Sequence, residues 1–140
     1  MASMADTGRE MRNAAITVEV PGLGPCDFRE FSWAENFKVW DILAEMGITD
    51  PDVDWEAFVS GDDPKANQNN MRRMFATATV AIQMTHPEAT FEQVAALFKP
   101  FDAEDDRLLS RIYGITATGK DVTEDDADAQ PAAGGNGNGA

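Results

Sequence analysis

The chain is poor in the residues that carry most enzyme and metal chemistry. It has one cysteine, Cys26, and one histidine, His86, among 140 residues. A single cysteine excludes an internal disulfide and a cysteine-based metal cluster, and it is typical of a reducing compartment. No serine or cysteine is placed by spacing to pair with His86, so nothing supports a catalytic triad or a histidine metal site. We therefore expect no catalytic, metal or cofactor site.

Basic residues are also scarce. The chain has 11 Lys and Arg against 25 Asp and Glu, which gives a formal net charge of −14. Such a field repels phosphate backbones and anionic lipid, so we expect neither a nucleic acid nor a membrane as partner. No apolar run approaches the length of a membrane span, and residues 1–13 lack the apolar centre of a secretory signal. The expected location is the cytoplasm of the cell.

Apolar residues are abundant enough for one globular domain. They make up 43% of the chain and include three tryptophans and eight phenylalanines. The composition changes near Gly114, after which the chain is acidic and closes on a run of Gly, Asn and Ala. Such a segment buries too little apolar surface to order. We predict a flexible N-terminus over 1–13, one domain over 14–114 and a disordered acidic tail over 115–140.

The N-terminal part of the domain has the pattern of a β-hairpin. Ile16, Val18 and Val20 alternate with polar residues, as in a half-buried strand. A Pro- and Gly-rich turn over 21–25 follows, and a second alternating run spans 26–31. A two-stranded hairpin is only marginally stable alone, so it must pack on the rest of the domain.

The rest of the domain reads as four to five helices, so the predicted fold class is mainly α with a small N-terminal hairpin. Ser32 and Glu35 have the spacing of a capping box, and Gly47 is placed to end the helix that starts there. A short helix should follow from Trp55. A long helix is expected over 64–85, a short one from Phe91, and a last one over 103–113 that Gly114 ends.

The first predicted helix carries a wide aromatic stripe. Trp33, Phe37 and Trp40 recur at i, i+4 and i+7, with further apolar residues to one side. We predict that Trp40 and Phe75 are buried where this helix crosses the long one. The periodicity alone does not distinguish a helix that faces its own core from one that faces a partner.

An acidic cluster at 50–54 resembles the start of a calcium-binding loop. Asp50, Asp52 and Asp54 have the alternating spacing of an EF-hand, but the loop position that needs Gly is Trp55 and the one that needs Glu is Gly61. The cluster is therefore interpreted as a turn followed by a helix N-cap.

The candidate partner-binding residues lie on the long helix, with one aromatic among three methionines. Methionine adapts to irregular apolar partners, although packing in the core is an open alternative for the same residues. The candidates are Met71, Met74, Phe75 and Met84.

The layout resembles that of a known family. A short hairpin (16–31), a helical body and an acidic low-complexity end are similar to the tail assembly chaperones of long-tailed bacteriophages. The resemblance implies a protein of the bacterial host cytoplasm that coats the helical, apolar tape-measure protein during tail assembly. It also implies as partners a second copy of the chain or a longer form made by ribosomal frameshifting. The Gly119-Lys120 pair is compatible with a slippery codon run.

The sequence thus predicts a non-enzymatic assembly chaperone. One alternative is a structural virion adaptor, such as a head–tail or tail component, which would stay in the finished particle. Another is a small enzyme that uses carboxylates, which would need desolvated acids packed in a cleft.

Overall fold

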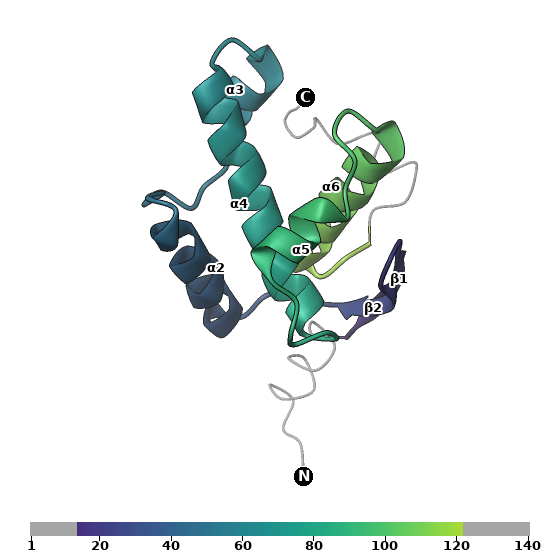
Figure 1. Cartoon of the computed structure of the whole chain (residues 1–140). Coiled ribbons are helices and arrows are strands. Elements are labelled where there is room, and N and C mark those ends of the chain that lie inside the picture. Colours follow the sequence, from purple (N-terminus) through teal and green to yellow (C-terminus); the bar gives the residue numbers. More distant parts are fainter. Residues whose placement is uncertain (1–13, 122–140) are drawn as a thin grey trace.

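The computed structural model of the protein describes residues 14–121 (Figure 1). The elements are β1 (Ile16–Val20), β2 (Gly24–Phe28), α2 (Trp33–Glu45), α3 (Trp55–Ser60), α4 (Pro64–Gln83), α5 (Phe91–Ala96) and α6 (Ala103–Thr118). The predicted fold class, mainly helical with a small N-terminal hairpin, is confirmed. The predicted flexible segment 1–13 and residues 122–140 of the predicted tail lie outside the described residues.

The hairpin forms as its alternation predicts. β1 and β2 pair antiparallel, with Val18 opposite Cys26, and Val18, Val20, Cys26 and Phe28 are all buried on one face. The amide of Leu23 donates to the Val20 carbonyl and closes the turn, in which Gly22 has a φ of 89° that favours glycine. A buried face this complete requires a partner layer, which α4, α5 and α6 provide.

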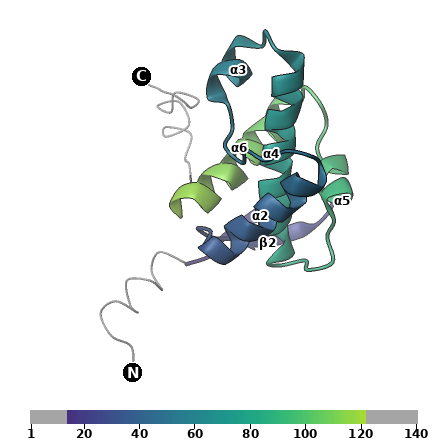
Figure 2. The ribbon, with the colours of Figure 1, turned by 90° about the vertical axis from the view of Figure 1, so that its left-hand side faces the viewer.

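The long helix α4 runs through the middle of the fold (Figures 1 and 2). Asp63 caps it by accepting the amides of Lys65 and Ala66, and Pro64 occupies its first turn. Residues 76–82 are buried on every side. The reason is that two core clusters meet there: Ala78 and Ile82 pack with the hairpin, α5 and α6, while Val80 packs with α2.

The prediction that Trp40 is buried at the crossing of α2 and α4 is wrong. Trp40 is 41% exposed, and the crossing is made by Val39 and Leu43 instead. These smaller side chains let the two helices approach closely, whereas the indole stands outside. Phe75 is half-buried on the opposite side of α4, edge-to-face with Phe98 at 5.4 Å between ring centroids.

The predicted end of the last helix at Gly114 is also wrong. α6 continues through Gly114 to Thr118, and Gly119 ends it with a φ of 76°. Ile115 and Thr116 are buried and continue the spacing of Ile112, so their burial outweighs the cost of about 1 kcal/mol for a glycine inside a helix. The domain therefore extends past 114, and Ile115 and Thr116 belong to its core.

The segment that links the hairpin to α2 is hydrogen-bonded both to α6 and to the first turn of α2. The amide of Phe31 donates to the carbonyl of Thr116 on α6. One residue later, the Glu35 carboxylate accepts the amide and the hydroxyl of Ser32, both at 2.7 Å. Although partial burial acts to raise it, these hydrogen bonds lower the pKa of Glu35. α2 therefore starts at a defined point and in a defined direction.

Candidate functional site

The largest exposed aromatic cluster lies on α2. We call Trp33, Phe37 and Trp40 the aromatic face; they are 66%, 53% and 41% exposed. Their ring centroids are 5.7–6.1 Å apart, and both contacts of Trp40 are edge-to-face. The rings therefore order one another while leaving a large part of their area in solvent. A contiguous aromatic surface of this kind is the usual mark of an interaction site.

The aromatic face exists because α2 carries more apolar residues than one contact can bury. At 100° per residue, Val39 and Leu43 point to α4, and Trp33, Phe37 and Trp40 fall about a third of a turn away. α4 can cover only one of the two stripes.

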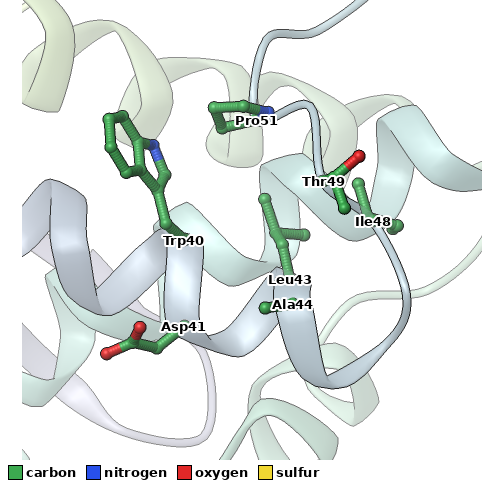
Figure 3. Close-up of a pocket in the computed structure, with 7 residues that line it drawn as sticks. All are labelled: Trp40, Asp41, Leu43, Ala44, Ile48, Thr49 and Pro51. Atoms are coloured by element: carbon green, nitrogen blue, oxygen red, sulfur yellow. The ribbon is translucent and has the colours of Figure 1, made fainter.

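The aromatic face continues into a hollow of about 490 Å³ (Figure 3). Its lining comes from the end of α2 and from the loop after it: Trp40, Asp41, Leu43, Ala44, Ile48, Thr49 and Pro51. Figure 3 shows the Trp40 indole and the Pro51 ring facing the same space from the helix and from the loop. The walls are mostly apolar; Asp41 belongs to the lining, and its carboxylate points away from Pro51 and the loop (Figure 3). The hollow suits an aliphatic or aromatic side chain of a partner.

A buried amide holds the loop that forms one wall of the hollow. Asn70 of α4 is fully buried, accepts the amide of Asp54 and donates to its carbonyl, both at 2.8 Å. Arg73 donates to the same Asn70 side chain and to the carbonyl of Asp50. Through Asp50 and Asp54 the backbone of the loop is hydrogen-bonded to side chains of α4, which fixes Pro51 opposite α2.

The predicted partner-binding residues on α4 are not brought together on an exposed surface. Met74 is 3% exposed and lies in the core, and Met71 and Phe75 pack against that core. Met84 is half-buried beside a small polar hollow that Arg29, Glu35, Lys38, Val80 and Gln83 also line. The alternative reading of core packing therefore holds for Met74.

A second, smaller aromatic cluster joins α3 to α6. Trp55 contacts Phe58 and Tyr113 edge-to-face, each at 5.9 Å between centroids. Trp55 and Phe58 are exposed, whereas burial, with a smaller contribution from Asp52, raises the pKa of Tyr113. This cluster holds the short helix α3, which has no buried residue of its own, on α6.

The acidic cluster at 50–54 acts as its interpretation predicted. Asp50 accepts the amide of Asp52, and Asp54 caps α3 by accepting the amide of Ala57. Within residues 14–121, no three His, Cys, Asp or Glu side chains are grouped to hold a metal ion. Cys26 lies buried in the hairpin, where desolvation, then Asp27 and Glu19, raise the pKa of its thiol.

Comparison with protein-family models, curated proteins and solved structures finds no match to this chain. No helix within the described residues has the length and apolar content that crossing a membrane requires. Function is therefore inferred from the surface of α2 and from the loop that follows it.

The sequence did carry a signal for this surface. The i, i+4, i+7 spacing of Trp33, Phe37 and Trp40 identifies a common stripe, and Val39 and Leu43 identify a second one. Two stripes on one helix with a single neighbouring helix indicate that one stays exposed. Large apolar side chains are usually the more buried ones, and this rule favours the wrong stripe here.

Proposed function

We propose that the protein is a non-enzymatic assembly chaperone that binds an apolar helical segment of a partner and keeps that partner soluble. The observation that carries this proposal is the aromatic face of α2. Three large rings stand in solvent on a helix whose other side already fills its place in the core. A groove beside a fixed helix is how amphipathic helices are commonly bound.

The resemblance to phage tail assembly chaperones supports the partner's identity as a tape-measure protein. Such a partner is long, helical and prone to aggregate, so a small acidic protein that covers its apolar stripe raises its solubility. The alternative, a structural adaptor of the virion, predicts that the protein is found in purified particles. The chaperone predicts abundance in infected cells and absence from particles.

Co-expression tests the proposal. The first step is to search beside this gene for a long coiled-coil reading frame. The measured quantity is then the soluble yield of its product with and without this protein. We expect a clear gain in soluble partner with the natural chain. The double variant Trp33→Ser, Phe37→Ser should lose the gain, because both side chains are more than half exposed and contribute little to the core.

A matched control is Val59→Ser, which removes an exposed apolar side chain from α3 and should keep the gain. Met74→Asp is not a useful probe, because a charge in the core would unfold the protein. Equal yield with and without the natural chain would argue against the chaperone function.

A further inference from the structure

The surface around the hollow has a one-sided charge. Residues 39–64 contain no Lys, Arg or His but eight acids, which are Asp41, Glu45, Asp50, Asp52, Asp54, Glu56, Asp62 and Asp63. Some have structural duties: Asp54 and Asp63 cap helices, and Asp50 holds a turn. Asp41 and Glu45 have neither duty, and both are exposed on α2.

These two carboxylates lie beside the apolar surface. On the helical wheel, Asp41 and Glu45 follow the aromatic face on the side turned away from α4, and Asp41 also lines the hollow. Among the described residues, no Lys or Arg lies within 4 Å ion-pair distance of either. Lys38, one turn before Asp41 on α2, is not within this distance, and Arg73 of α4 donates to the backbone carbonyl of Asp50 and to the Asn70 side chain. The charge is therefore left for a partner.

The same charge argues against a second copy of the chain as the occupant. Two copies would each bring the acids of residues 39–64 to a shared face, on chains of net charge −14. Like charges brought together at an interface repel each other and suppress that pairing. A cationic partner gains from the same field, and its Lys or Arg groups can also stack on exposed indole rings.

We propose that the aromatic face and the hollow bind an amphipathic helix whose apolar stripe is bordered by Lys or Arg. One apolar side chain of that helix occupies the hollow between Trp40 and Pro51, and its cations pair with Asp41 and Glu45. This inference rests on the proposed function and adds the charge of the partner and the position of its anchor.

Three synthetic helical peptides test it. They share one leucine stripe and carry Lys, Gln or Glu at the flanking positions, and binding to the full chain is measured by calorimetry at low and moderate salt. We expect the Lys peptide to bind about tenfold tighter than the Gln peptide and the Glu peptide to bind most weakly. Added salt should reduce the difference, since these charges are exposed.

Charge reversal locates the site. The double variant Asp41→Lys, Glu45→Lys should invert the order, so that the Glu peptide binds tighter than the Lys peptide. The control Glu19→Lys, Glu88→Lys makes the same change in net charge at exposed positions of the hairpin and of the α4–α5 loop. It should keep the original order. If the Lys preference survives in the α2 variant, or disappears equally in the control, the proposed location is wrong.

A second pair of variants tests the hollow. Ala44→Gln places a longer side chain into it, whereas Ala96→Gln makes the same change at an exposed position of α5. Ala44→Gln should weaken all three peptides about tenfold without changing their order; an effect equal to that of Ala96→Gln would refute the anchor.

Two outcomes separate this inference from the proposed function. Equal binding of the three peptides, lost in the Trp33→Ser, Phe37→Ser variant, would overturn the charge preference and leave apolar helix binding intact. Binding of none of the peptides would count against both.

Discussion

Phe101 combines two features that are rarely found together in a phenylalanine. It is fully exposed, and its φ of 62° lies in the left-handed region. The amide of Asp102 donates to the carbonyl of Lys99, so Pro100 and Phe101 are the central residues of a turn. A positive φ at the second central position favours glycine. Because the side chain is fully exposed, packing does not compensate for the backbone strain of Phe101.

We expect Phe101→Gly to stabilise the protein. Relief of the left-handed strain is worth about 1–2 kcal/mol, and the greater chain entropy of glycine returns about 0.5–1 kcal/mol of it. The expected net gain is about 0.5–1 kcal/mol in urea unfolding. Phe101→Ala is the control, because it removes the same ring but keeps a Cβ and its strain. If the glycine variant is no more stable than the alanine variant, strain at this turn is not significant.

At the scale of elements, the starts of the helices were better predicted than their buried faces. Helix starts depend on residues that are close in sequence: Asp63 caps α4, which begins at Pro64, and Thr90 and Gln93 form a capping box at the start of α5. The buried face of α2 depends on which residues α4 presents to it, which no local pattern contains. The same is true of the hollow, whose loop wall is held by Asn70, a residue far along the chain.

The end of α6 was predictable in principle. Glycine commonly ends helices, so Gly114 predicts a stop, yet Ile115 and Thr116 continue the apolar spacing beyond it. The helix ends at Gly119, whose positive φ favours glycine. Arg111 then donates two hydrogen bonds, of 2.7 and 2.6 Å, to the carboxylate of Asp121, and these bonds raise the pKa of Arg111.

Truncation tests this boundary. A chain that ends at Gly114 loses the buried Ile115 and the last turn of α6, and loss of such a side chain costs about 2–5 kcal/mol. We expect a loss of at least about 3 kcal/mol in the free energy of unfolding relative to a chain that ends at Asp121. Composition still predicts that residues 122–140 are dispensable, so the Asp121 variant should melt within a few degrees of the full chain. Equal melting of the two truncated chains would show that the last turn adds nothing.

For the molecule as a whole, the position of each acid matters more than the net charge of −14. Asp54, Asp63 and Asp102 cap helix N-termini, where a negative charge is favourable. Glu45 is the last residue of α2, where the helix dipole opposes it, and α2 has no basic residue in its last turn. Glu45 is therefore unfavourable for folding, and it borders the aromatic face. Retention of such an acid is typical of a binding surface that is selected at some cost in stability.

Glu45→Lys should therefore raise stability and weaken partner binding in the same molecule. The substitution replaces an unfavourable charge at a helix C-terminus with a favourable one, which is worth about 0.5–1 kcal/mol and a few degrees in melting temperature.

Glu104→Lys is the matched control. It gives the same net charge but removes an acid from the first turn of α6, so it should lower the melting temperature and leave binding of the Lys peptide unchanged. If both variants raise the melting temperature equally, stability is governed by relief of overall charge repulsion and not by the local helix dipole. Glu45 would then not be specifically unfavourable for folding. A Glu45→Lys variant that is more stable and binds the Lys peptide as tightly as the natural chain would show that this carboxylate serves neither folding nor binding.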